Sequence, residues 1–252
     1  MLAIVLLLAF PRLQPSDLVN LSQGKVVTKK NFIEPEFVES LLGDISTLRR
    51  AGSFKVANIG NDKTLNEEIR VSESFFLSGS NTHTNNEARK TLFGVLDAMQ
   101  DDLGQNEPML DKSTMEASYV YYSNGGFYKR HIDAVPNSVS ILRRYSFLLY
   151  LNQKWEEEDG GQLRVFEGDS THTQTRNFYD IKPEAGTLVI FPSDSVQHEV
   201  LQSKKERLVV VGWFNRKVSL TDVFKINDAS LVKQAGLGLA SVILILTGLS
   251  ML

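Results

Sequence analysis

The chain has 252 residues, of which 42% are hydrophobic, and a formal net charge of -3. This length and composition suffice for one sizeable core, in one domain or at most two. The weak negative charge and the lack of a polybasic run argue against nucleic acid as a partner. Because the sequence has no cysteine, it excludes disulfides, zinc-thiolate sites, iron–sulfur clusters and a cysteine nucleophile.

Residues 1–30 are predicted to be an N-terminal leader. The stretch 1–10 is apolar, too short to span a bilayer, and has no Lys or Arg in front of it, so it resembles an imperfect signal-peptide core. Residues 11–30 are polar and have no clear period, which indicates an irregular lead-in to the folded domain.

Two amphipathic helices are predicted next. Apolar side chains recur at helical spacing in Glu36–Ala51, which follows Pro35, and again in Asn85–Leu103. These apolar residues are Phe37, Leu41, Leu42, Ile45 and Leu48, then Leu92, Phe93, Leu96 and Met99. Because a helix with one apolar stripe must cover another element, both helices are expected to buttress a sheet.

From Ala117 onward the pattern changes to short β-rich runs separated by Gly, Pro, Asn and charged residues. The predicted strands are Ser118–Tyr122, Tyr145–Leu151, Gln162–Phe166, Thr187–Phe191 and Leu208–Phe214. Strands of this kind are typical of an antiparallel double-sheet jelly roll. We therefore predict an α+β domain over residues 31–216, a double-stranded β-helix (jelly roll) with N-terminal buttressing helices.

The C-terminal segment is predicted to hold a linker, 217–234, and a hydrophobic tail, 235–252. The tail carries no charge, and Lys233 stands just before it. Its length is the lower limit for a membrane-spanning helix, and it has no polar stripe, so we expect it to insert into a membrane. If residues 1–10 act as a signal, the domain faces the lumen of the endoplasmic reticulum or secretory pathway. Without a signal, the tail anchors a domain that faces the cytosol.

Two histidines and one aspartate form the leading candidate site. His131 and Asp133 are two residues apart, so on a strand they would point to the same face. The chain has only 4 histidines, and His198, from a distant segment, can complete a set of two histidines and one carboxylate. Such a set suits Fe(II) with open positions for oxygen chemistry. Taken alone, a His-x-Asp pair also fits hydrogen-bonded core residues.

Arg207 adds a further constraint. It opens the β-rich run 207–214, and at period two it shares a face with Val209, Val211 and Trp213. A cation on the inner face of an apolar strand is costly unless it meets an anion. A dicarboxylate co-substrate would supply that anion.

Three motifs resemble one enzyme family. The stretch 122–133 fits the pattern Y-x-x-G-x-x-Y-x-x-H-x-D at every fixed position, and Gly160-Gly161 precede a predicted strand as in that family's G-G segment. The run 70–77 is similar to the R-x-S-x-x-x-F-L run of plant and algal members. On these motifs, residues of roughly 30–216 resemble the prolyl 4-hydroxylase group of Fe(II)/2-oxoglutarate dioxygenases.

The resemblance implies roles for individual residues. By position, His131, Asp133 and His198 would hold Fe(II), and Arg207 would bind the distal carboxylate of 2-oxoglutarate. Three aromatic residues match positions in the co-substrate pocket: Tyr150, which would also bond that carboxylate, Tyr122, which would line the pocket, and Trp213, which would form its wall. Tyr150 and Trp213 also fit plain core aromatics, and only one of the neighbours Tyr121 and Tyr122 can point inward.

The implied activity is that of a 2-oxoglutarate-dependent dioxygenase, procollagen-proline 4-dioxygenase-like. It would hydroxylate a prolyl residue in a protein or peptide and decarboxylate 2-oxoglutarate to succinate, with Fe(II) and O2 required and ascorbate a candidate reductant. Collagen-type and plant-type members generally have Lys where this chain has Arg207, so the substrate stays open. One alternative is a hydroxylase of a free amino acid or small metabolite. Another is a non-catalytic, membrane-tethered jelly-roll module that binds peptides.

Overall fold

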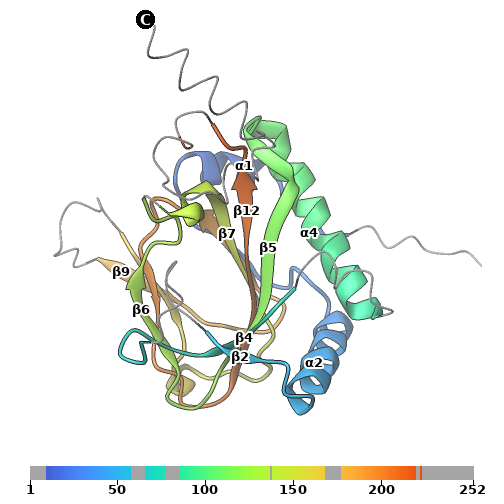
Figure 1. The fold of residues 1–252 in the computed structure, drawn as a ribbon, viewed down its shortest axis with the longest axis vertical. Coiled ribbons are helices and arrows are strands. Elements are labelled where there is room, and N and C mark those ends of the chain that lie inside the picture. The colour runs from blue at the N-terminus through green and yellow to red at the C-terminus, as the bar shows by residue number, and fades with distance from the viewer. Residues whose placement is uncertain are drawn as a thin grey trace, which may run out of the picture.

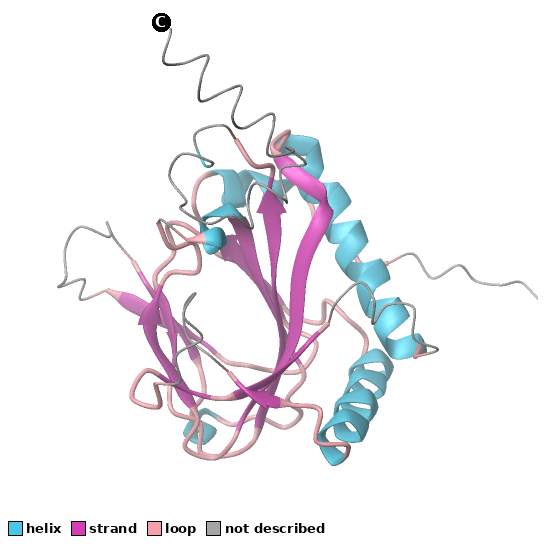
Figure 2. Ribbon diagram, viewed as in Figure 1, coloured by secondary structure: helices cyan, strands magenta, loops and turns pink. Residues whose placement is uncertain are grey.

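The structure is a computed structural model that describes residues 10–57, 66–77, 86–136, 138–167, 177–219 and 222. Two antiparallel sheets face each other, and helices α2 (Pro35–Arg50) and α4 (Glu87–Asn106) lie outside the larger sheet (Figure 1). Colouring by secondary structure separates the helical layer from the strands (Figure 2). The predicted α+β jelly roll with buttressing helices is confirmed.

The larger sheet has the strand order β1-β10-β7-β12-β5-β4-β2 and the smaller sheet has the order β3-β6-β11-β8-β9. The larger sheet contains β1 (Val27–Lys29), β2 (Lys55–Val56), β4 (Glu73–Phe76), β5 (Leu110–Tyr122), β7 (Arg143–Tyr150), β10 (Leu188–Pro192) and β12 (Arg207–Arg216). The smaller sheet contains β3 (Arg70–Val71), β6 (Phe127–His131), β8 (Leu163–Phe166), β9 (Phe178–Ile181) and β11 (His198–Val200). All strands predicted from the sequence form, as β5, β7, β8, β10 and β12.

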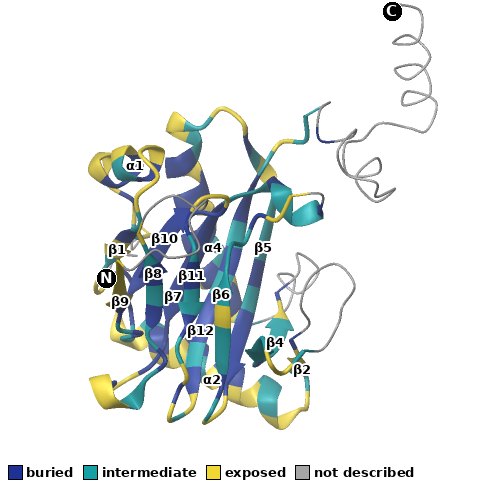
Figure 3. Cartoon of the chain, turned by 90° about the vertical axis from the view of Figure 1, so that its left-hand side faces the viewer, coloured by how far each residue is buried: buried dark blue, intermediate teal, exposed yellow. Residues whose placement is uncertain are grey.

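Alternation along the strands of the larger sheet produces two apolar layers. Tyr119 and Phe147 belong to the layer between this sheet and the helices, where Leu41 of α2 packs. Their neighbours Val120 and Leu148 belong to the layer between the two sheets, because successive residues of a strand point to opposite faces. Buried residues accordingly run along the strands of both sheets in Figure 3. The candidate site lies in the layer between the sheets.

The irregular lead-in predicted for residues 11–30 is wrong. Helix α1 (Pro15–Ser22) begins with Pro at its first position, where the missing N–H is no loss. Leu18 and Leu21 of α1 join the helix-side core, and β1 pairs with β10 at the edge of the larger sheet. Since α1 has only 8 residues, its apolar stripe is too short to stand out as a period.

A buried ion pair joins α2 to α4. Asp44 accepts hydrogen bonds from the Arg89 guanidinium at 2.7 and 2.8 Å and from the Asn86 amide at 2.7 Å. The Asp44 and Arg89 side chains are only 2% and 10% exposed, and the bond to Asp44 raises the pKa of Arg89. Asn86 also caps α4 by accepting a hydrogen bond from the Arg89 backbone N–H. The pair therefore fixes the two helices against each other over the sheet.

Asp44→Ala is expected to lower the free energy of unfolding by about 3–5 kcal/mol, because it leaves the buried Arg89 charge without a partner. Urea denaturation measures this change. Lys112→Ala is the matched control, since it breaks an exposed ion pair with Asp101, and it should cost less than about 1 kcal/mol. Equal losses in the two variants would contradict the role assigned to the buried pair.

No helix within the described residues is long and apolar enough to cross a membrane. The predicted hydrophobic tail, 235–252, and residues 1–9 lie outside the described part of the chain. Membrane insertion of the tail therefore stays a prediction.

Candidate metal and anion site

His131 and His198 lie opposite each other on neighbouring strands of the smaller sheet. His131 ends β6, His198 begins β11, and their Cα atoms are partners in the antiparallel register. The ring centroids are 4.2 Å apart. A backbone carbonyl orients each ring: Nδ1 of His131 lies 2.7 Å from the Lys129 oxygen, and Nδ1 of His198 lies 3.1 Å from the Val196 oxygen. Both Nε2 atoms are left available to a ligand.

Asp133 joins the two histidines from the turn after β6 rather than from the strand itself. Its backbone N–H donates to the Ser193 carbonyl at 3.2 Å, and the Ser146 hydroxyl donates to its Oδ2 at 2.7 Å. Oδ1 lies 3.5 Å from Nε2 of His131, and Oδ2 lies 3.7 Å from Nε2 of His198. The side chains converge as predicted, but a turn held by β7 and the residue after β10 brings them together.

The chemistry of this cluster fits a divalent cation. Ligand atoms of His131, Asp133 and His198 all lie within 4.8 Å of one another. Burial lowers the pKa of His198 to about 4, and the nearby His131 acts in the same direction, so the ring is neutral as metal binding requires. Burial alone would raise the pKa of Asp133, but the neighbouring histidines and the Ser146 hydroxyl outweigh it and hold the pKa well below its usual range. Two neutral imidazoles and one carboxylate form a set that suits Fe(II).

Tyr128 packs against the His131 ring and so supports the cluster of candidate metal ligands, His131, Asp133 and His198. The two rings are stacked, with centroids 3.6 Å apart. The guanidinium carbon of Arg70 lies 4.8 Å from the Tyr128 centroid, and Arg70 Nε donates to the Ser72 hydroxyl at 2.7 Å. The sequence motif at Arg70 and Ser72 therefore contacts the cluster through Tyr128. Sequence reasoning gave no role to Tyr128, although it is a fixed position of the matched motif, and nothing in the sequence pointed to Ser146.

Arg207 lies at the start of β12 and is 0% exposed. Its Nε donates a hydrogen bond to the Gly161 carbonyl at 2.9 Å. Its two terminal nitrogens, Nη1 and Nη2, have no hydrogen-bond partner within the described residues. The guanidinium carbon lies 4.9 Å from the Tyr122 ring centroid and 5.2 Å from that of Tyr150. A buried guanidinium with a free planar fork fits a carboxylate.

The two tyrosines predicted beside Arg207 both point into the layer between the sheets. Tyr122 is the cross-strand partner of Arg207, and it faces inward, whereas Tyr121 donates to Glu206 on the outer side. Tyr150 is 0% exposed, and its hydroxyl has no partner within the described residues. Burial raises the pKa of Tyr150 to about 12, so the hydroxyl stays neutral and can donate a hydrogen bond.

A cavity of about 250 Å³ opens over the metal cluster. His131, Asp133 and His198 line it together with Trp213, the predicted wall residue, and Tyr122, which links the cavity to Arg207. At its rim, the Arg143 guanidinium carbon lies 3.5 Å from the Trp213 ring centroid, and Arg143 pairs with Glu116 at 2.7 Å. Five of the seven predicted site residues thus line one cavity, and the other two, Arg207 and Tyr150, lie next to each other beside Tyr122.

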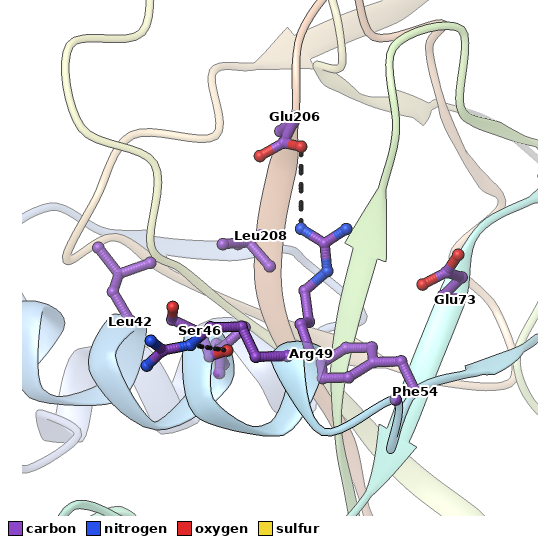
Figure 4. A pocket seen from close by; sticks show the side chains of 10 residues that line it. Leu42, Ser46, Arg49, Phe54, Glu73, Glu206 and Leu208 are labelled. Atoms are coloured by element: carbon purple, nitrogen blue, oxygen red, sulfur yellow. Dashed lines mark hydrogen bonds and ion pairs between the residues drawn. The ribbon is translucent and has the colours of Figure 1, made fainter.

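A second hollow, of about 480 Å³, lies on the opposite side of the larger sheet, beside the C-terminal half of α2 (Figure 4). Two of its charged groups form an ion pair: Arg49 Nη1 lies 3.8 Å from Glu206, which also accepts the Tyr121 hydrogen bond at 2.6 Å. The Arg49 guanidinium carbon is 3.4 Å from the Tyr121 ring centroid. Because Arg49 and Arg50 already have partners, and no group of metal-ligand side chains among the described residues lines the hollow, we assign the candidate site to the smaller inner cavity.

Comparison with known proteins agrees with this geometry. Residues 117–215 match the family model of the 2OG-Fe(II) oxygenase superfamily. The solved structure of a Pseudomonas putida prolyl-4-hydroxylase is 28% identical, with a TM-score of 0.67 over 80% of this chain and 97% of that one. A Trichoplax adhaerens prolyl hydroxylase, solved with a hypoxia inducible factor peptide fragment, shares the fold at 20% identity and a TM-score of 0.68, over 79% of this chain and 87% of that one.

A PKHD-type hydroxylase of Alteromonas mediterranea is 26% identical over 134 residues, which cover 50% of this chain and 56% of that protein. The chain therefore matches only about half the length of this curated relative. The resemblance to the Fe(II)/2-oxoglutarate dioxygenases is confirmed, with prolyl 4-hydroxylases among the structural neighbours.

Asp133→Ala is expected to abolish tight binding of Mn(II), used as an air-stable substitute for Fe(II), because it removes the only carboxylate of the described cluster. Electron paramagnetic resonance of free Mn(II) measures the binding. Asp180→Ala is the control, since Asp180 is paired with Arg164 on the outer face of the smaller sheet, and it should bind Mn(II) like the wild type. Wild-type affinity in Asp133→Ala would refute the assigned metal ligands.

Proposed function

We propose that this protein is an Fe(II)/2-oxoglutarate-dependent dioxygenase that hydroxylates a prolyl residue in a protein or peptide. The observation that carries the proposal is the buried Arg207 guanidinium, whose terminal nitrogens lack partners among the described residues, next to a cavity lined by two histidines and a carboxylate. A metal site alone would fit several chemistries. A metal site combined with a buried cation for a carboxylate favours a dicarboxylate co-substrate.

In this proposal each part of the site has one task. His131, Asp133 and His198 hold the metal, and Ser146 keeps the Asp133 carboxylate oriented through its hydrogen bond at 2.7 Å. Arg207 and the Tyr150 hydroxyl bind the distal carboxylate of 2-oxoglutarate, which fixes the co-substrate's orientation. When bound, iron would supply the oxidation of 2-oxoglutarate by O2 to succinate and CO2, coupled to insertion of one oxygen atom into a substrate C–H bond.

The prolyl substrate is proposed from the relatives and from the cavity rim. The Pseudomonas putida neighbour is a prolyl-4-hydroxylase and covers 80% of this chain. The cavity opens past the Trp213 ring and the Arg143–Glu116 pair, so its rim offers an aromatic face and both charges to a peptide. Ascorbate is proposed as a reductant on the basis of the resemblance alone. Comparing activity with and without ascorbate tests whether the protein requires it.

Arg207→Ala is expected to raise the half-saturating concentration of 2-oxoglutarate by roughly 10–150-fold. A hydrogen bond to a charged partner contributes about 1.5–3 kcal/mol, and a tenfold change in affinity corresponds to ~1.4 kcal/mol. Arg207→Lys should recover part of the loss, because it keeps the charge without the planar fork. Succinate production measures the effect, with Arg164→Ala, an outer-face arginine, as control. An unchanged half-saturation in Arg207→Ala would contradict the proposal.

A proline-rich peptide incubated with the protein, Fe(II), 2-oxoglutarate and O2 is expected to gain the mass of one oxygen atom on proline, in step with succinate formation. Mass spectrometry with fragmentation locates the modified residue. Free proline and other free amino acids, tested in parallel, distinguish a peptide hydroxylase from a small-metabolite hydroxylase. Modification of the free amino acids alone would overturn the peptide assignment while leaving the dioxygenase assignment intact.

A further inference from the structure

The Gly160–Gly161 turn contacts the Arg207 side chain directly. Arg207 Nε donates to the Gly161 carbonyl at 2.9 Å, which is the only hydrogen bond that its guanidinium makes within the described residues. A guanidinium is planar, so a fixed Nε–H direction also fixes the plane in which Nη1 and Nη2 lie. Gly161 therefore determines where the two free nitrogens point.

The turn itself is held from two sides. The Gly161 N–H donates to the Gln202 carbonyl at 3.1 Å, and the Trp155 indole N–H donates to the Gly160 carbonyl at 2.9 Å. Trp155 is 3% exposed, and this second bond is partly buried, so its loss would leave a buried indole N–H without a partner. The Gly161 carbonyl thus contacts Arg207 from a backbone segment that two hydrogen bonds hold in place.

Both glycines have left-handed backbone angles, but their surroundings differ. A Cβ on Gly160 (φ +69°) would lie 2.2 Å from the Gln202 carbonyl oxygen, so a side chain there would push the two backbone segments apart. A Cβ on Gly161 (φ +66°) would lie 3.0 Å from Cδ of Arg207, 3.1 Å from Oγ of Ser203 and 3.2 Å from the Trp155 ring. A side chain at position 161 would therefore crowd the Arg207 side chain, and its absence leaves room for Arg207.

We propose that Gly161 is a positioning residue for the co-substrate: its carbonyl orients the Arg207 guanidinium, and its missing side chain leaves the space in which Arg207 lies. The Gly160–Gly161 turn then sets the affinity for a dicarboxylate without touching it. This inference rests on the proposed function, because it assumes that Arg207 binds 2-oxoglutarate.

The test is equilibrium binding of 2-oxoglutarate to the Mn(II)-loaded protein by isothermal titration calorimetry, which requires no turnover. Gly161→Ala is expected to weaken binding about tenfold or more, since it displaces a charge-assisted contact, and to leave Mn(II) affinity unchanged. Gly52→Ala is the matched control. Gly52 has nearly the same backbone angle (φ +65°) but no atom within 4 Å of the added Cβ, so binding should stay within about twofold of the wild type.

A double-mutant cycle separates positioning from general damage. In an Arg207→Ala background, Gly161→Ala should cause no further loss of 2-oxoglutarate affinity, because the side chain that it displaces is gone. Additive losses would overturn the proposal. If Gly161→Ala does not fold, Trp155→Phe takes its place: it removes the indole N–H that holds Gly160, and unchanged 2-oxoglutarate affinity would overturn the proposal.

The two hypotheses fail in different ways. If the wild type binds Mn(II) but not 2-oxoglutarate, or if Arg207→Ala binds 2-oxoglutarate as the wild type does, the proposed co-substrate is wrong and the inference falls with it. If Arg207→Ala loses affinity while Gly161→Ala matches Gly52→Ala, the co-substrate assignment holds and only the role of Gly161 is wrong.

Discussion

The buried charge of Arg207 is the constraint on which the rest of the site depends. Transfer of a cation into an apolar layer is costly unless hydrogen bonds and an opposite charge compensate it. Within the described residues, Arg207 has one hydrogen bond, to Gly161, and two ring faces nearby, from Tyr122 and Tyr150, but no carboxylate. These contacts hold the guanidinium in place and leave its outer edge for a bound anion.

The arrangement of the sheets places Arg207 beside Tyr122, which lines the same cavity as the candidate metal ligands. The smaller sheet supplies His131 and His198 as cross-strand partners, and the larger sheet supplies Arg207 at the start of β12. Neither sheet contains the whole site, so it forms only when the two inner faces pack together. The helices on the outer face do not contribute side chains to the cavity; they cover the other face of the larger sheet and are joined by the Asp44–Arg89 pair.

Most helices and strands with a clear hydrophobic period could be predicted from the sequence, and so could the candidate site residues that belong to a motif. The amphipathic helices and the strands rich in apolar residues stand out by spacing, and the proposed metal and co-substrate residues stand out by type and motif. Helix α1, with 8 residues, was not predicted because it is too short for a period to develop. Strand β6 is as long as β10, but it contains Lys129 and Arg130 and no β-branched residue, so its composition does not indicate a strand, and β11 has only 3 residues. The contacts of Ser146 with Asp133 and of Gly161 with Arg207 join residues far apart in the chain, so only the fold brings them together.

If the buried Arg207 binds the second carboxylate of the co-substrate, a 2-oxo acid without that carboxylate should bind more weakly. The most direct test compares 2-oxoglutarate with 2-oxobutyrate, which keeps the 2-oxo acid group but lacks the distal carboxylate, by calorimetry on the Mn(II)-loaded protein. The wild type should prefer 2-oxoglutarate by about tenfold or more, and this preference should disappear in Arg207→Ala. If Arg207→Ala kept the full preference, a group other than Arg207 would bind the distal carboxylate, which would contradict the role proposed for Arg207.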